Sequence, residues 1–574
     1  MVPGRSLSMA ENDSVLCPAL MTKRGDFLMM VWLTVCCIVV RCVNVSENHY
    51  SGFLFCSVHA LPYLCKANAE WPAWPQTYKT SANLQQNIRK KKEVEEKLMI
   101  IDELKSQIGL ALGFTPTNGQ AEAIDTFCRF WTSRTPQPVM VLTGSAGTGK
   151  TSLAAALVKT LHHIKQRMIL LAPTGRAAKV FSQNASLPAY TIHRKIYRQR
   201  SFGGNDMGFN LNDNLHRDTL FLVDEASMVA NNAYGDTAHF GSGCLLDDLV
   251  HYVYSGDNCR LMLIGDKAQL PPVGEEESPA LMPQFLQGYG LSVYHTNLDE
   301  VLRQAADSGI LYNATVVRKM ITHDQLTQLP LIRFARFADI VMVPGGELIE
   351  QLAGSYSEVG TDETIVVTRS NKRANIYNAG IRNMVLGREE NLCSGDMLMV
   401  VKNNYYWTEK EKDSPLSFIA NGDRAIVQRV RGVRSMYGFM FADVWLRFPD
   451  YNDHEMQVTA LMDSLTSEAP SLTREQSERL FAAVLEDYQD LTLKAERMKA
   501  LRNDAYFNAL QIKFAYSVTC HKAQGGQWAH VYIDQGYMTD DMLTPDYIHW
   551  LYTAFTRATE KLFLVNWPKT QIEP

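Results

Sequence analysis

The sequence lacks several patterns that would assign it quickly to a class of protein. It contains no C-x-x-C pair, no internal repeat, no low-complexity tract and no cluster of carboxylates of the kind that nucleases use. Zinc fingers are therefore not expected, and the spacing of Cys56, His59 and Cys65 fits no usual zinc site. The net charge of −5 excludes a surface covered with positive charge, but it allows a local basic groove for nucleic acid.

An apolar run long enough for a membrane span is also missing. Residues 27–40 would form a helix of roughly 21 Å, whereas a hydrocarbon core is about 30 Å thick. The run resembles the core of a signal peptide, but its leader is long and it lacks a clean cleavage site. A membrane anchor stays open as an alternative.

Our expectation for residues 1–98 is an N-terminal extension outside the functional protein, translated from a wrongly chosen start. Cysteine and aromatic usage changes abruptly after this segment, which motivates the expectation. We then expect a cytoplasmic protein with no stable membrane association. The sequence does not indicate protein partners.

The clearest pattern is VMVLTGSAGTGKT, at residues 139–151. Its apolar start predicts a buried strand, and the segment that follows predicts a helix. Glycines between them let backbone N–H groups turn inward around phosphate oxygens, at a helix N-terminus that adds partial positive charge. Lys150 is placed to reach the β- and γ-phosphates and Thr151 to hold Mg²⁺. The residues expected around the nucleotide are Gly144, Ser145, Ala146, Gly147, Thr148, Gly149, Lys150, Thr151 and Ser152.

Two acidic residues follow a second buried-strand candidate, TLFLV at residues 219–223. The carboxyl ends of parallel strands face the ligand crevice of an open sheet. We therefore expect Asp224 to bind Mg²⁺ and Glu225 to orient and deprotonate the attacking water.

Two glutamines are further candidates for the nucleotide site. Gln269 follows the strand at residues 260–264 and is placed to sense the γ-phosphate, although a loop hydrogen bond to backbone would also explain it. Gln120 offers a donor and an acceptor that suit an adenine edge. The simpler alternative for Gln120 is a surface glutamine near a helix start.

GSAGTGKT, DEAS and GDKAQLPPV, in this order, resemble the motifs of superfamily 1 helicases in their RecD-like and Dda-like branch. LDEVLRQAADSGI, SVTCHKAQGGQW and WLYTAFTRA extend the match, which covers most of the chain from about Met99. The resemblance implies an α/β fold of two RecA-like P-loop domains with parallel sheets and ATP between them. It also implies that Arg303 and Arg557 reach the ATP from the second domain, which makes hydrolysis depend on closure. Gln524 and Gly525 would lie beside the nucleotide and the hinge.

The resemblance further implies that single-stranded DNA crosses loops at the strand ends of both domains. Threonine and backbone N–H contacts hold phosphates without reading sequence. A buried, satisfied histidine remains an alternative interpretation of His521. The matching residues are Thr174, Gly175, Arg176, Thr191, Ile192, His193, Thr519 and His521.

A basic and aromatic segment at residues 194–217 predicts a β-hairpin inserted in the first domain. Gly203 to Asp206 give the turn signal, and Phe202 lies beside them. In related helicases a hairpin here is the pin that splits the duplex, and a forked duplex would be its substrate. A solvated surface hairpin is the alternative.

The expected domains are residues 99–300 for the first and residues 301–391 with residues 512–574 for the second. Between the two parts of the second domain, residues 392–511 change to short strands, turns and then charge-mixed helices. They resemble the small β-barrel insertion of RecD-like enzymes. Its role in this chain is open.

The function implied is an ATP- and Mg²⁺-dependent DNA helicase that moves 5′ to 3′ on single strands. The direction comes from the resemblance alone. The alternatives are a translocase of opposite polarity, one acting on RNA, or an ATPase clamp that closes on DNA without unwinding it. A clamp needs no water activation, so Glu225 and Arg557 together speak against it.

Overall fold

The structure is a computed structural model, and it describes residues 99–199, 209–232, 241–300, 307–322, 328–411, 416 and 418–574. The predictions for residues 1–98, Phe202, the turn at Gly203 to Asp206 and Arg303 fall outside these residues. Within the described residues, no helix has both the length and the apolarity needed to cross a membrane. The same part of the chain holds no group of three or more His, Cys, Asp or Glu side chains that could bind a metal.

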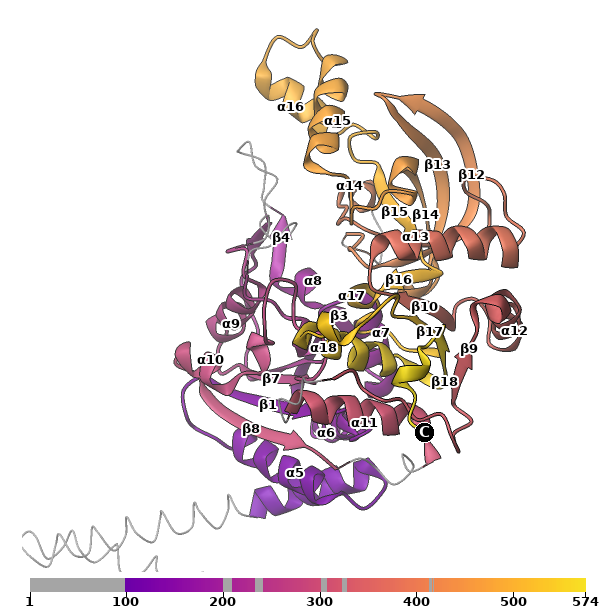
Figure 1. The fold of residues 1–574 in the computed structure, drawn as a ribbon. Helices are drawn as coiled ribbons and strands as arrows, with labels where there is room; N and C mark the ends of the chain where they lie inside the picture. The colour runs from indigo at the N-terminus through magenta and orange to yellow at the C-terminus, as the bar shows by residue number, and fades with distance from the viewer. Residues whose placement is uncertain are drawn as a thin grey trace, which may run out of the picture. The chain divides into compact units, whose positions relative to one another are not determined.

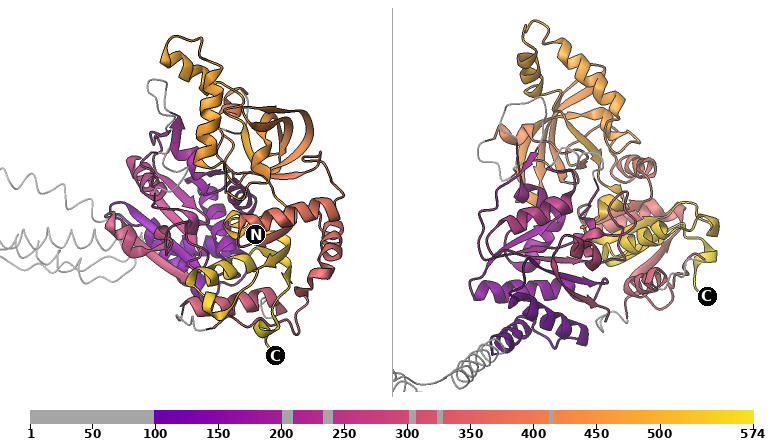
Figure 2. Two further views of the ribbon diagram at one scale, coloured as in Figure 1. Left: turned by 45° about the horizontal axis from the view of Figure 1, so that its top comes forward. Right: turned by 90° about the vertical axis from the view of Figure 1, so that its left-hand side faces the viewer.

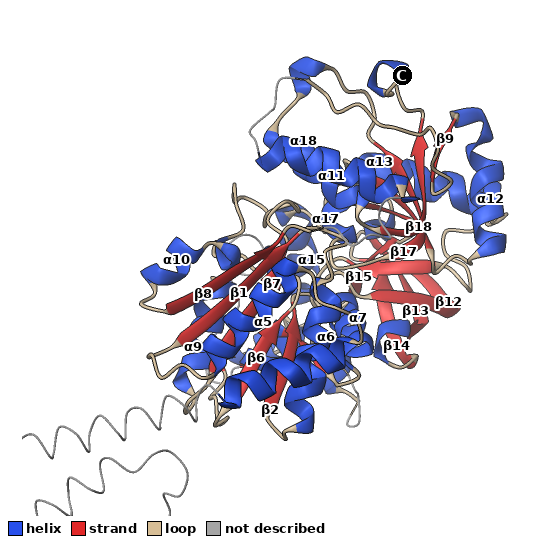
Figure 3. Cartoon of the chain, turned by 90° about the horizontal axis from the view of Figure 1, so that it is seen from below, coloured by secondary structure: helices blue, strands red, loops and turns tan. Residues whose placement is uncertain are grey.

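The first domain is built on a six-stranded parallel sheet (Figure 1). Alternate residues of its strand β1 enter two separate cores, Val139 and Val141 on one face and Met140 and Leu142 on the other. Both faces are therefore covered, as expected for parallel strands joined through helices (Figure 3). In spatial order the strands are β3 Ala189–Thr191, β2 Arg167–Ala172, β6 Thr219–Val223, β7 Arg260–Gly265, β1 Pro138–Gly144 and β8 Ser292–Leu298.

The helices of the first domain include the two that begin next to the candidate nucleotide and DNA residues. These are α6 Lys150–His163 and α7 Gly175–Ala185. The others are α5 Asn118–Trp131, α8 Ile192–Ile196, α9 Leu245–Ser255 and α10 Pro283–Gly288. The predicted hairpin is confirmed as an antiparallel pair of β4 Tyr197–Gln199 and β5 Phe209–Leu211.

The second domain has a five-stranded parallel sheet. Its strands, in spatial order, are β16 Ser517–Thr519, β10 Thr364–Thr368, β17 Trp528–Asp534, β18 Ala558–Val565 and β9 Ile340–Val343. Its helices include α11 Gly309–Thr322, α12 Leu348–Glu358, α13 Asn371–Gly380, α17 Cys520–Ala523 and α18 Pro545–Phe555. The predicted fold class of two RecA-like domains is confirmed.

The predicted barrel is confirmed as five strands that close on themselves. They are β11 Met397–Val400, β12 Arg424–Met436, β13 Phe439–Phe448, β14 His454–Leu461 and β15 Leu510–Phe514. The expected end of the insertion at residue 511 falls inside β15, because this strand pairs with β11 through Phe514. The barrel therefore extends to Phe514.

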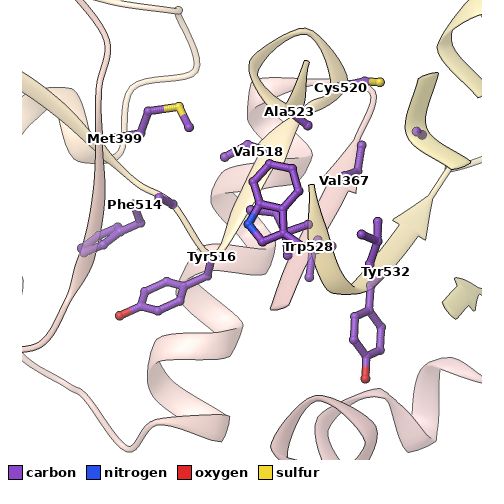
Figure 4. Close-up of a cluster of buried hydrophobic side chains, with 14 of the residues drawn as sticks. Val367, Met399, Phe514, Tyr516, Val518, Cys520, Ala523, Trp528 and Tyr532 are labelled. Carbon is purple, nitrogen blue, oxygen red and sulfur yellow. The ribbon is translucent and has the colours of Figure 1, made fainter. Parts of the chain in front are cut away.

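The barrel shares one core with the second domain. Met399 of β11 and Phe514 of β15 belong to the same buried cluster as Trp528 and Val367 of the parallel sheet (Figure 4). The helices α15 Arg474–Glu486 and α16 Lys494–Arg502 pack on Phe439 of β13 and extend away from the barrel strands (Figure 2). Barrel and second sheet thus form one packed body.

Candidate nucleotide and nucleic-acid site

The glycine loop leaves the end of β1, whose seven residues are all buried. Gly147 and Gly149 have φ angles of 76° and 81°, which L side chains rarely adopt. A Cβ on Gly144 would lie 2.8 Å from the Cβ of Leu298. The loop therefore needs glycine at three positions, two for backbone conformation and one for space.

Two side chains hold the glycine loop through hydrogen bonds to its backbone carbonyls. The amide of Gln120, which is fully buried, donates to the Thr148 carbonyl at 3.1 Å and accepts the N–H of Thr117 at 3.1 Å. Lys150 Nζ donates to the carbonyls of Gly144 and Ser145, each at 2.8 Å. Gln120 is thus engaged with backbone on both sides, and its binding to adenine stays a prediction.

Asp224 and Glu225 lie at the end of β6, beside the loop. Removal of the Asp224 carboxylate from solvent, with the negative charge of Glu225 nearby, raises its pKa to about 7. The Lys150 ammonium acts in the opposite direction. Glu225 has a left-handed φ of 52°, and its N–H donates to Asp224 Oδ1 at 2.9 Å. A left-handed φ is strained for a residue other than glycine, so the turn that carries Glu225 is held by its surroundings.

Arg557 reaches Glu225 from the second domain. Its Nη1 lies 4.0 Å from Glu225 Oε1, and the arginine is 2% exposed. Its guanidinium donates to the carbonyls of Thr553 and Gly526 and to the Thr556 hydroxyl. The end of α18 therefore holds a preoriented positive charge against the turn that follows β6.

The segment after β7 lies against the second domain as well. The N–H of Leu270 donates to Thr553 Oγ1 at 2.7 Å, and the Leu270 carbonyl accepts a hydrogen bond from Gln524 Nε2 at 2.7 Å. Gln269 is buried, and its Oε1 has no hydrogen-bond partner among the described residues. The predicted Gln269 and Gln524 therefore lie along one seam between the two domains.

Three further seam residues were not singled out from the sequence. Tyr552 OH accepts the N–H of Ala146 at 2.9 Å, and His549 Nδ1 lies 2.9 Å from the Ala268 carbonyl. Together with Thr553 they project from one side of α18. The segment WLYTAFTRA carried a signal for Thr553 alone, which lies four residues before Arg557 and therefore near it at the end of the helix.

The candidate DNA residues of the first domain lie at two helix starts. Thr174 caps α7 by accepting the Ala177 N–H at 3.2 Å, and Thr191 caps α8 by accepting the Arg194 N–H at 3.3 Å. Desolvation lowers the pKa of His193, so it is neutral near pH 7. The threonine hydroxyls thus already bond to backbone.

Two of the motif residues meet across the seam. A Cβ on Gly525, whose φ is 71°, would lie 3.1 Å from Thr174 Oγ1. Arg176 donates to the Gln527 carbonyl and stacks over the Trp528 ring at 4.4 Å. The first DNA motif therefore contacts the segment that carries Gly525.

The remaining DNA candidates lie at the start of α17. Thr519 is its N-cap residue, without a side-chain capping bond. The side chain of His521 is exposed, although neighbouring protein atoms desolvate its imidazole and lower its pKa.

The barrel touches the N-terminus of α7. A Cβ on Gly175 would lie 2.6 Å from Asp423 Oδ1 and 2.7 Å from the Tyr451 hydroxyl, which itself donates to Asp423 at 2.9 Å. Lys179 Nζ donates to the Pro449 carbonyl at 2.8 Å. Nothing in the sequence motifs indicated this contact.

Two protein-family models match this chain, one in the first domain and one in the second. Residues 115–324 match the AAA domain, and residues 514–565 match the UvrD-like helicase C-terminal domain. The first match contains the glycine loop with Asp224, and the second contains Gln524 with Arg557. Together the two matches support a superfamily 1 helicase, and with it an enzyme that depends on ATP.

Individual relatives of this helicase differ in how much they share with it. An uncharacterized protein of Acanthamoeba polyphaga mimivirus is 23% identical over 493 residues, which are 74% of this chain and 94% of that protein. The ATP-dependent RecD2 DNA helicase of Deinococcus radiodurans is 32% identical over 177 residues, which are 31% of this chain but 21% of RecD2. A crystal structure of Pif1 helicase from Bacteroides, with ADP-AlF3 and single-stranded DNA, has a TM-score of 0.41 and 16% identity, covering 80% of this chain and 95% of its own.

Proposed function

We propose that this helicase hydrolyses ATP at the seam between its two RecA-like domains and uses the closure to move along single-stranded DNA and unwind duplex. The observation that carries the proposal is the approach of Arg557 to Glu225 at 4.0 Å, from opposite sides of the seam. A base and a transition-state cation from different domains make turnover depend on closure.

The residues divide the chemistry as follows. The backbone N–H groups of Ala146 to Lys150 close on the phosphates, with the Lys150 ammonium free to leave the carbonyls of Gly144 and Ser145. Glu225 takes the proton of the attacking water, and Arg557 faces the charge that develops on the transferred phosphoryl group. Gln269 has an unused buried carbonyl oxygen for the water or the terminal phosphate.

The residues at the loop also fit a bound Mg²⁺. Mg²⁺ prefers oxygen ligands and one or two carboxylates together with phosphates. Asp224 supplies a carboxylate whose pKa is raised by desolvation and by the nearby charge of Glu225, and Thr151 supplies a hydroxyl at the start of α6. When bound, Mg²⁺ would neutralise phosphate charge.

DNA is proposed as the nucleic acid because the motifs resemble RecD-like enzymes and because a relative, RecD2, is described as a DNA helicase. Thr174, Gly175, Arg176, Thr191, His193, Thr519 and His521 are proposed to hold its backbone, and the β4–β5 hairpin to act as the pin. Movement 5′ to 3′ is proposed by resemblance.

Strand displacement on forked DNA tests the proposal. Forks with a 5′ or a 3′ single-stranded tail, in DNA and in RNA, are incubated with and without ATP, and Lys150→Ala serves as the inactive control. ATP-dependent release from the 5′-tailed DNA fork is expected. Release from the 3′-tailed fork alone reverses the polarity, and DNA-stimulated hydrolysis without release establishes the clamp.

A further inference from the structure

Tyr552 joins the phosphate loop to the second domain through its hydroxyl. The hydroxyl accepts the Ala146 N–H at 2.9 Å and donates to Asp266 Oδ2 at 2.5 Å. Tyr552 belongs to α18, whereas Ala146 and Asp266 follow β1 and β7 of the first sheet. One buried hydroxyl therefore bridges both domains at the loop.

The protonation of this hydroxyl defines its hydrogen bonds. Burial and the Asp266 carboxylate hold the pKa of Tyr552 well above its ordinary value, so the phenol keeps its proton. Its single O–H bonds to Asp266, and its oxygen accepts from Ala146. Asp266 Oδ1 in turn accepts the Ala268 N–H at 3.0 Å. The bridge is thus a directed chain of hydrogen bonds rather than a loose contact.

A phosphate oxygen of a bound nucleotide would compete with Tyr552 for the Ala146 N–H. Ala146 lies inside the glycine loop, whose N–H groups close on phosphate oxygens in the proposed function. A single N–H cannot give a full hydrogen bond to both Tyr552 and a phosphate oxygen. A phosphate that takes this donor must displace the tyrosine hydroxyl.

Displacement of the Tyr552 hydroxyl would also affect the other contacts that α18 makes with the first domain. Thr553 accepts the Leu270 N–H, and the Thr553 carbonyl accepts Nε of Arg557 at 3.0 Å. His549, one turn earlier, lies against the Ala268 carbonyl. Tyr552 therefore lies on the helix that leads to the arginine of the seam, five residues before it.

We propose that Tyr552 is a positioning residue whose hydroxyl exchanges with the terminal phosphate of ATP on the Ala146 N–H, so that filling the loop releases α18 to bring Arg557 forward. The inference rests on the proposed function and adds to it a residue that distinguishes ATP from ADP. ADP lacks the terminal phosphate and leaves the tyrosine bridge in place.

Tyr552→Phe tests this exchange, because it keeps the ring and removes the hydroxyl. Without the competing bond, a non-hydrolysable ATP analogue should bind roughly three- to tenfold more tightly, whereas ADP affinity should change less than twofold. Tyr547→Phe is the matched control. It lies on the same helix and donates to Gln535, away from the loop, so neither affinity should change.

The outcomes separate this inference from the proposed function. Unchanged or weaker analogue binding by Tyr552→Phe, or equal shifts for the analogue and ADP, overturns the exchange while the proposed function stands. A wild-type protein that binds neither nucleotide refutes the proposed function and the exchange with it.

A second measurement applies if Tyr552→Phe does not fold. 3-Fluorotyrosine at position 552 keeps the hydroxyl and reports its surroundings by ¹⁹F NMR. The resonance should move on addition of the ATP analogue and move far less with ADP. A resonance that ignores the analogue in a protein that binds it overturns the proposal.

Discussion

Arg557 Nη1 lies 4.0 Å from Glu225 Oε1, although Glu225 follows β6 of the first sheet and Arg557 precedes β18 of the second. The arginine is held by three hydrogen bonds of its own and does not depend on Glu225 for its position. Glu225 is placed by a left-handed turn directly after β6. Each group is therefore preoriented by its own domain, and their approach reports how the domains meet.

Replacement of the proposed base tests the chemistry on the first-domain side. Glu225→Gln keeps the side-chain shape, so ATP affinity should change less than about threefold, whereas hydrolysis should fall by roughly 10²- to 10⁴-fold. ATP binding and steady-state hydrolysis are measured in parallel. Glu478→Gln, an exposed helix glutamate paired with Arg474, should hydrolyse ATP like the wild type. Substantial turnover by Glu225→Gln would contradict the base assignment.

The raised pKa of Asp224 predicts a pH dependence of stability. The pKa of this carboxyl is about 3.9 in the unfolded chain and about 7 in the folded protein. Between these values the folded chain binds more protons on this group, so its contribution to stability falls as pH rises and is constant above pH 7.

Asp224→Asn should remove this pH dependence. Without nucleotide or divalent cation, its midpoint of thermal unfolding should exceed that of the wild type by an amount that grows from pH 4 to pH 7 and then levels off. Asp257→Asn, at an exposed carboxylate, is the control. A difference that is the same at pH 5 and pH 8 would show that the carboxyl is not perturbed.

The Leu270 backbone predicts a mutation that loosens the seam. Thr553→Val leaves the buried Leu270 N–H without its acceptor, which costs about 1–3 kcal/mol. Hydrolysis should fall roughly ten- to hundredfold while ATP affinity changes little, because the glycine loop is untouched. Thr364→Val, at a buried threonine that donates to the Gly360 carbonyl away from the seam, is the matched control. Equal losses of hydrolysis in Thr553→Val and Thr364→Val would show that general destabilisation, and not the seam, causes the effect.

The contact between the barrel and α7 predicts competition with DNA. Asp423 lies over Gly175, so a DNA phosphate at this helix start has to meet or displace a carboxylate. Asp423→Ala should tighten single-stranded DNA binding about threefold or more at pH 8 and low salt, where the wild-type carboxyl, with a pKa raised to about 7, is ionised. Fluorescence anisotropy measures it.

A control for that experiment lies on the same barrel. Asp463 accepts the Met440 N–H as Asp423 accepts the Ala420 N–H, but Asp463 follows β14, whereas Asp423 lies against Gly175 of α7. Asp463→Ala should leave DNA affinity unchanged. Equal affinities of wild type and Asp423→Ala would show that no strand approaches Gly175.

The local parts of the site could be predicted from the sequence because each follows its own strand. The glycine loop, Asp224 and Glu225 are such cases. The capping box of Thr117 and Gln120 also carried a readable signal, since T-x-x-Q at a helix start predicts the backbone bonds that Gln120 makes.

The contacts between domains could not be predicted in this way. Tyr552 with Ala146, Thr553 with Leu270 and Asp423 with Gly175 join segments that lie far apart in the chain. They depend on how two sheets and a barrel pack, and no residue pattern within either segment encodes that. The same limit explains the barrel boundary, since the motif nearest Phe514 does not show which sheet the strand joins.

Steady-state ATP hydrolysis with saturating single-stranded DNA tests the central claim most directly, when Lys150→Ala, Arg557→Lys and the exposed-site control Arg474→Lys are compared with wild type. Lys150 lies on the first-domain side of the seam and Arg557 on the second-domain side. The account predicts that Lys150→Ala and Arg557→Lys, both folded by their melting curves, lose nearly all hydrolysis while Arg474→Lys keeps it. Hydrolysis by Arg557→Lys at the wild-type rate would mean that the first domain works alone, and it would contradict the account.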